Sequence, residues 1–328
     1  MHTVSFWSAN LPKIEQTLGA IALFFAVLGV IFYLAGKVNG RAARPLSTAI
    51  FLVPALVLLA AGLVFPAGKT ILYSFKDAYS NKYVGFQNYT WMIHNSEIHQ
   101  VIWNTLLWIA ITPCVTTALG LVLAIMLNRL KRESLPKSLL FMPMAISFVG
   151  ASIIWQFVYN FAPPSQPQTG LLSAISRTLG FTPPNWILTQ PLNTFLLMVI
   201  FTWVETGFAM VILSAAIKGV PADIIEASAL DGAHGWKLFK SVTFPMVRST
   251  FIVVFATMVV TSLKLFDIVR TVTGGNFGTS VISNEMYSQI FVRFDQGRGS
   301  ALAVILFILV TPILIYNIRN LRRERAIS

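Results

Sequence analysis

Long unbroken apolar runs constrain this chain more than any other feature of its sequence. Seven stretches are long enough to cross a bilayer, because a spanning helix needs about 20 mostly apolar residues. They lie at residues 18–35, 46–67, 101–127, 138–161, 194–217, 249–266 and 299–318. Charged residues make up 11% of the chain, less than half of the roughly 25% that is typical of soluble proteins. The sequence therefore predicts an all-α integral membrane protein with about seven transmembrane helices.

The composition argues against several kinds of site and partner. The single cysteine, Cys114, excludes an intrachain disulfide and a cysteine-based metal cluster. The four histidines are scattered, so we expect no metal site. A net charge of +12 would point to nucleic acid in a soluble protein. In a membrane protein the same excess collects in cytoplasmic loops, so we expect contact with membrane lipid and no nucleic acid.

Basic residues gather in every second connecting segment. Four such segments hold 15 of the 24 Lys and Arg residues. These residues are Lys37, Arg41, Arg44, Arg129, Lys131, Arg132, Lys137, Lys218, Lys237, Lys240, Arg248, Arg319, Arg322, Arg323 and Arg325. Cytoplasmic loops carry such an excess, so these segments are predicted to be cytoplasmic. The N-terminus is then outside and the C-terminus in the cytoplasm, as an odd number of spans requires.

The segment 218–249 between the fifth and sixth spans is predicted to begin with a short helix. Gly219 and Pro221 end the preceding span and start the new helix, since proline suits a first helical turn. This helix covers residues 222–230 and places Asp223 near its positive N-terminus.

A second short helix is predicted at residues 236–242. Gly232 and Gly235 allow a tight turn with positive φ before it. Pro245 interrupts the helical pattern before span six. The two helices expose Ile224, Ile225, Leu230, Trp236, Leu238 and Phe239. Such a surface either rests on lipid or docks a soluble partner.

This segment resembles the EAA loop of ABC importer permeases, which reads E-A-A, three residues, G, nine residues, I-x-L-P. The matching positions are Glu226, Ala227, Gly232 and Pro245, with Asp231 and Ala233 also typical of the loop. Ser228, Val242 and Phe244 replace the second alanine, the isoleucine and the leucine of the pattern.

The resemblance extends over about residues 45–320 and is closest to the carbohydrate-uptake, maltose-type branch. It includes Gly85-Phe86-Gln87-Asn88-Tyr89, Asn104-Thr105, Gly120-Leu121, Leu127-Asn128-Arg129, Phe266-Asp267, Thr273-Gly274-Gly275 and Gly299-Ser300-Ala301-Leu302. It implies a six-helix type I permease core at 45–320 that contains the coupling loop 218–248. Residues 1–44 would then form an N-terminal segment with an accessory helix, and residues 321–328 a cytoplasmic tail.

The resemblance implies one half of a transport pathway in a bacterial inner membrane. Its partners would be a second permease, two cytoplasmic ABC ATPase subunits and an extracytoplasmic sugar-binding protein. We expect a heterodimer of permeases rather than a homodimer. ATP and Mg would be bound by the ATPases, and this chain would bind no cofactor. Glu226 would pair with a basic residue of an ATPase or cap locally, and Gly232 would permit the turn.

The chain lacks the motifs of an enzyme. A P-loop requires G-x-x-x-x-G-K-[ST], and the nearest candidate, Gly68-Lys69-Thr70, has Leu63 where the first glycine is needed. Neither H-E-x-x-H nor G-x-S-x-G occurs. ATP hydrolysis would therefore belong to the partner subunits.

Charged residues in the spans require a reason, because each costs roughly 2.5–3.5 kcal/mol at the centre of a membrane helix. Glu205 lies near the middle of span five. Lys264, Asp267 and Arg270 are spaced to share one face at the end of span six. They form either an internal ion-pair network or a polar wall of a sugar path. A third alternative is proton coupling by Glu205.

By alignment with the maltose-type family, the stretch before Thr273-Gly274-Gly275 contributes substrate contacts. The predicted path residues are Thr261, Ser262 and Leu265, with Lys264 and Asp267, and with Met144 and Ser147 from span four. The maltose permease has an Asn-rich stretch here that this chain lacks, which argues against maltose itself. The alternatives are an ABC permease for a non-sugar solute such as glycerol phosphate, or an ion-coupled secondary transporter.

Overall fold

The computed structural model describes residues 3–37, 43–163 and 165–325, and these residues are almost entirely helical. Their only β feature is an isolated antiparallel bridge between Lys76 and Tyr83. Six helices are long and apolar enough to cross a membrane, or seven when a bent pair counts as one span. They are Glu15–Lys37, Ser47–Tyr73, Ser96–Leu127, Leu192–Lys218, Gly235–Leu263 and Gln296–Tyr316, with the pair Ser134–Ala145 and Phe148–Val158. The predicted all-α membrane fold is confirmed.

The chain divides into two compact units, and the first is Met1–Lys69. It holds α1 (Thr3–Lys37), α2 (Ala43–Leu59), the π-helical segment Ala60–Val64 and the start of α3 (Phe65–Tyr73). In α2, Phe51 packs edge to face on Phe32 of α1, with 5.6 Å between ring centroids. None of the residues in the apolar windows of the two spans is buried, as expected for helices that face lipid or another subunit.

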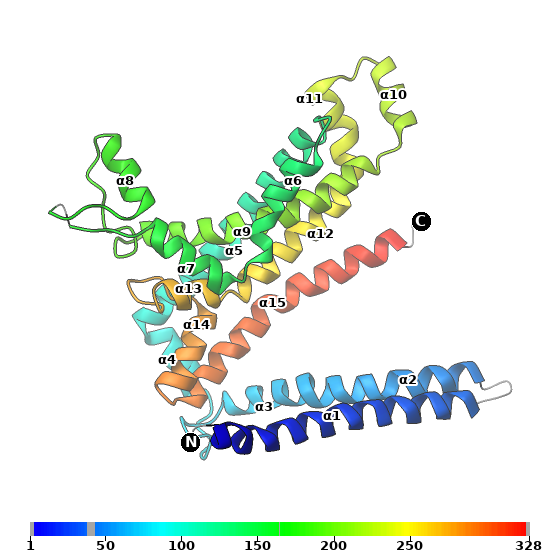
Figure 1. The fold of residues 1–328 in the computed structure, drawn as a ribbon, viewed down its shortest axis with the longest axis vertical. Coiled ribbons are helices and arrows are strands. Elements are labelled where there is room, and N and C mark those ends of the chain that lie inside the picture. Colours follow the sequence, from blue (N-terminus) through cyan, green and yellow to red (C-terminus); the bar gives the residue numbers. More distant parts are fainter. Residues whose placement is uncertain (1–2, 38–42, 164, 326–328) are drawn as a thin grey trace. The chain divides into compact units, whose positions relative to one another are not determined.

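The second unit, Thr70–Ser328, contains the remaining helices. They are α4 (Gln87–His94), α5 (Ser96–Leu127), α6 (Ser134–Phe141), α7 (Phe148–Val158), α8 (Leu171–Thr178), α9 (Leu192–Lys218), α10 (Ala222–Leu230), α11 (Gly235–Leu238), α12 (Phe244–Leu263), α13 (Asp267–Val272), α14 (Ile282–Tyr287) and α15 (Gln296–Arg325). The long helices α5, α9 and α12 pack together, with α10 at one end of the bundle and α13 and α14 at the other (Figure 1).

The predicted domain limits at 44/45 and 320/321 stay predictions. Residues 38–42, which include Arg41 of the first basic segment, and residues 326–328 of the predicted tail lie outside the described residues.

Glycines set the closest helix contacts of this bundle. A Cβ at Gly120 of α5 would lie 2.6 Å from the Cβ of Ala209 in α9. A Cβ at Gly207 of α9 would lie 2.5 Å from the carbonyl oxygen of Leu140 in α6. Contacts this short leave no room for a side chain at either glycine. Helix α9 therefore packs closely against both α5 and α6.

The span predicted at 138–161 is present as a bent pair of helices. The span consists of Ser134–Ala145 and Phe148–Val158, which meet at an angle of 101°. Pro143 lies in the 3₁₀ turn that ends the first half. Ser147 then adopts an extended conformation, and its Oγ accepts a hydrogen bond of 3.1 Å from the amide of Gly150. This N-cap starts α7 in a new direction, which explains the bend.

The predictions around span six also need two corrections. The second short helix expected at 236–242 is not separate, because Gly235–Leu263 forms one continuous apolar helix. A π-helical turn at Phe239–Thr243 joins α11 to α12, and Pro245, which has no amide hydrogen to donate, lies just after this turn.

The second correction concerns the far end of this span. There α12 ends at Leu263, and α13 begins only at Asp267. Lys264 caps α12 and therefore does not share one helical face with Asp267 and Arg270.

Candidate functional site

The short helix α10 has the bounds predicted from the sequence and ends in a Schellman motif. Gly232 has φ +77°, and its amide donates to the carbonyl of Ala229 at 3.0 Å. The amide of Ala233 donates to the carbonyl of Ser228 at 2.9 Å. A Cβ at Gly232 would meet no atom within 4 Å, so only the backbone conformation requires glycine here.

The surface of α10 and α11 is open to a partner. Leu230 is 91% exposed and Trp236 is 73% exposed. Glu226 is also exposed, and its carboxylate makes no hydrogen bond or ion pair with any other residue that the structure describes. Apolar side chains beside an unpaired carboxylate form a surface suited to a groove with a basic residue. The predicted set Glu226, Ala227, Ser228, Asp231, Gly232 and Ala233 therefore lies on one short structural unit, with Pro245 further along in α12.

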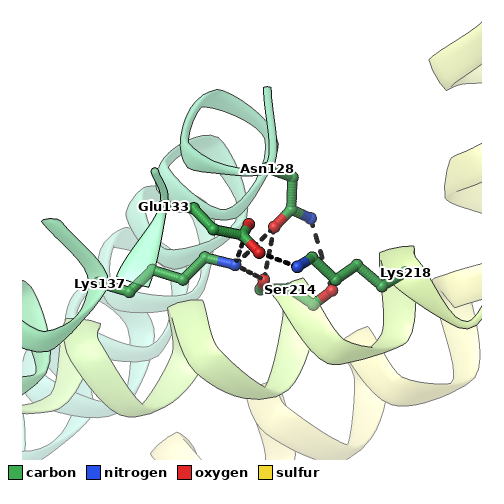
Figure 2. A network of polar contacts seen from close by, with 5 residues as sticks. All are labelled: Asn128, Glu133, Lys137, Ser214 and Lys218. Carbon is green, nitrogen blue, oxygen red and sulfur yellow. Dashed lines mark hydrogen bonds and ion pairs between the residues drawn. The ribbon is translucent and has the colours of Figure 1, made fainter. Parts of the chain in front are cut away.

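A polar network lies at the end of α9 that leads into α10 (Figure 2). Lys137 Nζ donates to Asn128 Oδ1 at 2.7 Å, to Glu133 Oε2 at 2.9 Å and to Ser214 Oγ at 2.5 Å. The hydroxyl of Ser214 donates to Asn128 Oδ1 at 2.7 Å. Lys218, the last residue of α9, pairs with the other oxygen of Glu133. The network thus joins the α5–α6 loop to the last turns of α9.

Two ammonium groups lower the pKa of Glu133. Its carboxylate accepts hydrogen bonds from Lys218 and from Lys137, and these contacts stabilise the charged form. Side-chain exposures of 26% for Glu133 and 17% for Lys137 leave this pair partly shielded from solvent. The network was not predicted from the sequence, although the i, i+4 spacing of Glu133 and Lys137 was a visible signal.

The predicted path residues at the end of α12 and in the break after it differ in their surroundings. Ser262 is buried, and its Oγ lies 2.6 Å from Thr112 Oγ1 of α5. Leu265 is buried in the core cluster that includes Trp108 and Met258. Thr261 is half-buried and donates to the carbonyl of Thr257 at 3.0 Å. Ser262 and Leu265 therefore pack helices together, and Thr261 has more open surroundings.

The two breaks in the spans lie against the same core cluster. Leu265 lies in the break between α12 and α13, and Ile146 and Phe148 flank the bend of the fourth span. Met144 and Ser147 at this bend are exposed, Lys264 in the other break is exposed, and Asp267 is half-buried. The structure thus brings the two predicted groups of path residues to neighbouring elements.

The predicted ion-pair network of span six does not form among the described residues. Their ion pairs join Glu133 to Lys137 and Lys218, Glu285 to Arg293, and Asp295 to Arg298. Arg270 instead lies over the ring of Tyr287, 4.8 Å from its centroid. Glu205 is half-buried in α9 without an ion pair in that part of the chain. No group of three His, Cys, Asp or Glu side chains in the described residues could hold a metal ion.

Comparison with known families gives one match. The family described as "Binding-protein-dependent transport system inner membrane component" matches residues 117–323, which include the network, α10 and both breaks.

Two relatives resemble the chain over most of its length. The osmoprotective compounds uptake permease protein GgtC of Synechocystis sp. is 45% identical over 84% of this chain and 98% of its own length. The alpha-glucoside transport system permease protein AglF of Rhizobium meliloti is 42% identical over 97% of this chain and 93% of its own.

Among solved structures, a bacterial alginate ABC transporter in complex with an alginate pentasaccharide-bound periplasmic protein has a chain with the same fold. The TM-score is 0.74 at 18% identity, over 86% of this chain and 96% of that one.

Proposed function

Because the chain belongs to the binding-protein-dependent transport system inner membrane component family, we propose that it is the permease subunit of an ABC importer for a sugar. The observation that carries the proposal is the exposed helix α10, which presents an unpaired Glu226 beside a glycine turn within the matched region. Proteins of this family are not themselves catalytic. The proposed role of this chain is to form part of the solute path and to change conformation during transport.

The proposed substrate is an oligosaccharide or glycoside. AglF is named for alpha-glucoside transport, which fits a hydroxyl-rich solute, and GgtC is named for the uptake of osmoprotective compounds. Thr261, Lys264 and Asp267 would offer hydrogen bonds to such a solute near the break between α12 and α13. Met144 and Ser147 would contribute from the neighbouring bend, while Ser262 and Leu265 hold the surrounding helices in place.

The proposed partners are a second, different permease, two cytoplasmic ATPases and an extracytoplasmic sugar-binding protein. The ATPases would bind ATP and Mg, and this chain would bind no cofactor. In the proposed orientation the N-terminus is outside and α10 and the C-terminus are cytoplasmic. One ATPase would take α10 into a cleft and contact Glu226 with a basic residue. Closure of the ATPases would then move α9 through the network of Asn128, Glu133, Lys137, Ser214 and Lys218.

A pull-down tests this proposal. Tagged protein is recovered from native membranes in mild detergent, and its partners are identified by mass spectrometry. The wild type should recover an ABC ATPase and a second permease. The double variant Glu226→Ala/Gly232→Val should lose the ATPase and keep the permease, since valine is strained at the φ of +77°.

The matched control is Glu15→Ala/Gly180→Val. Glu15 is an exposed acid on α1, and Gly180 has φ +82° in a place where a Cβ would meet no atom within 4 Å. This control should keep both partners. Recovery of no ATPase with the wild type would contradict the proposal and favour ion-coupled transport, with Glu205 as the next residue to test.

A further inference from the structure

Two adjacent cavities lie at the end of the bundle opposite α10. The first has a volume of about 280 Å³ and polar walls that include Glu97, Asn276, Asn284 and Arg293. The second has a volume of about 350 Å³ and is lined by Trp103, Leu107, Gln190, Asn193 and Phe195, among others. Gln100, Asn104 and Gly278 belong to both cavities and form the wall between them.

Two glutamine side chains meet over this wall. A Cβ at Gly278, where φ is +68°, would lie 2.5 Å from Gln100 Nε2 and 2.9 Å from Gln190 Nε2. Both glutamines are exposed, and neither amide makes a hydrogen bond with the rest of the described chain. Each amide therefore keeps one acceptor and two donors for a ligand.

The loop that carries Gly278 is held by its own hydrogen bonds. Asn104 Nδ2 donates to the carbonyls of Gly278 at 2.6 Å and Ser280 at 2.9 Å. Asn193 Nδ2 donates to the carbonyl of Phe277 at 2.9 Å. Because these contacts satisfy the loop, the glutamine amides are not needed to hold it.

One buried acceptor on the wall of the polar cavity has no hydrogen-bond partner among the described residues. Asn284 is 1% exposed, and its Nδ2 donates to Ser280 Oγ at 3.0 Å. Its Oδ1 is buried and accepts no hydrogen bond from the described residues. Buried polar atoms are nearly always paired, so this oxygen requires an O–H or N–H donor from outside that part of the chain.

The chemistry of the two cavities fits an uncharged, hydroxylated ring compound. Hydroxyl groups both donate and accept, as the amides of Gln100, Gln190 and Asn284 require. The apolar cavity supplies the flat ring of Trp103 for the C–H face of a sugar. Glu285 pairs with Arg293 at 3.5 Å, which leaves the carboxylate of Glu97 without a balancing charge and disfavours an anionic solute. Ligand sites usually measure about 300–1,000 Å³, and the two cavities, of about 280 and 350 Å³, lie near the lower end of this range.

We propose that these cavities form a second sugar-binding site, separate from the path residues at the break between α12 and α13. Gln100 and Gln190 hydrogen-bond the hydroxyls, and Trp103 contacts the ring face. This inference rests on the proposed function, because it assigns to the imported sugar a further place on the same subunit.

Protection of an introduced cysteine tests the site. The full transporter is reconstituted in nanodiscs without its binding protein, and Cys114, the only cysteine, is replaced by serine. Glu97→Cys then provides a reporter on the rim of the polar cavity, labelled with a membrane-impermeant maleimide. The probe is whichever of sucrose, trehalose and maltose the wild-type transporter imports fastest. Saturating probe should slow the labelling severalfold.

A double variant shows whether the glutamines bind the probe. Gln100→Ala/Gln190→Ala in the reporter background should raise the probe concentration for half-protection by roughly tenfold, as expected for two lost hydrogen bonds. The matched control is Gln87→Ala, at an exposed glutamine of α4 that lines neither cavity. It should leave the protection unchanged.

Labelling that the imported probe does not slow, or protection that the double variant retains in full, would overturn the site. A wild-type transporter that imports none of the three sugars would contradict the proposed function instead. The proposed second sugar-binding site would then lose its basis as well. The import measurement thus separates the two failures.

Discussion

Lys137 Nζ lies 2.5 Å from Ser214 Oγ, a contact between residues 77 positions apart that ties α6 to the end of α9. Asn128 Oδ1 accepts from both groups at 2.7 Å, so ammonium, hydroxyl and amide form a closed triangle. Lys218 follows Ser214 by one helical turn and precedes α10 by only three residues. We therefore expect a displacement of α10 to affect α5 and α6 as well as α9.

Replacing Lys137 should weaken this connection. Lys137→Met removes three hydrogen bonds and leaves the side-chain oxygen of Asn128 and the carboxylate of Glu133 with fewer partners. We expect a loss of about 1–3 kcal/mol in the free energy of unfolding, seen as a lower Tm of the purified protein. Lys131→Met, at an exposed lysine of the same loop, is the control and should leave Tm unchanged. Equal Tm values for the two variants would contradict the role of the triangle.

The lowered pKa of Glu133 predicts a pH dependence of stability. A carboxyl whose pKa is lower in the folded state contributes stability above its ordinary pKa of about 4.3. That contribution disappears as the pH falls through the lowered folded pKa. Tm measured from pH 7 to pH 3 should fall more steeply for the wild type than for Glu133→Gln. Parallel curves would show that the two lysines do not stabilise this carboxylate.

The contact of α9 with α6 should not accept a methyl group. A Cβ at Gly207 would lie 2.8 Å from the Cα of Phe141, and this backbone atom cannot rotate away. Gly207→Ala should destabilise the protein by about 1–3 kcal/mol, as overpacking does. The matched change Gly68→Ala, in helix α3 with no atom within 4 Å, should be neutral or slightly stabilising. A stable Gly207→Ala protein with wild-type Tm would mean that α6 and α9 are further apart.

Ser147 caps α7 at the bend of the fourth span and should tolerate replacement only by another capping residue. Ser147→Ala loses the acceptor for the Gly150 amide and should cost about 1 kcal/mol. Ser147→Asn keeps an acceptor of suitable length and should retain most of the stability. Thermal unfolding of both variants checks this, and equal losses would argue against a capping role.

Local signals were sufficient to predict helix α10 and the turn that follows it. Pro221 before the helix and Gly232 after it determine both ends of α10, so its bounds and its positive-φ turn were predicted correctly. The apolar runs likewise predicted the spans, because the length needed to cross a bilayer constrains them directly.

The breaks in the spans were missed for a physical reason. A run of apolar residues has the same composition whether the helix is straight or bent, so hydropathy does not reveal the 101° bend. Pro143 and the capping Ser147 were the available signals. The end of α12 at Leu263 carries no comparable marker, and its break is set by packing against α5 and α14.

The polar contacts between distant segments could not be predicted from spacing. The hydrogen bond between Lys137 and Ser214, and the approach of Gln100 and Gln190 to Gly278, depend on how the helices are placed. The resemblance to importer permeases predicted where substrate contacts would lie. The burial of Ser262 and Leu265 emerged only from the packed structure.

ATP-driven uptake in proteoliposomes tests the central claim most directly. The permease is reconstituted with the ATPase and second permease that it recovers from membranes, together with their binding protein, and uptake of labelled sucrose, trehalose and maltose is followed. We predict uptake that requires ATP with the wild type, and a decrease to roughly a tenth or less with Glu226→Ala/Gly232→Val. Uptake that is independent of ATP and driven by a proton gradient would contradict the account. Full ATP-driven uptake by the double variant would contradict it as well.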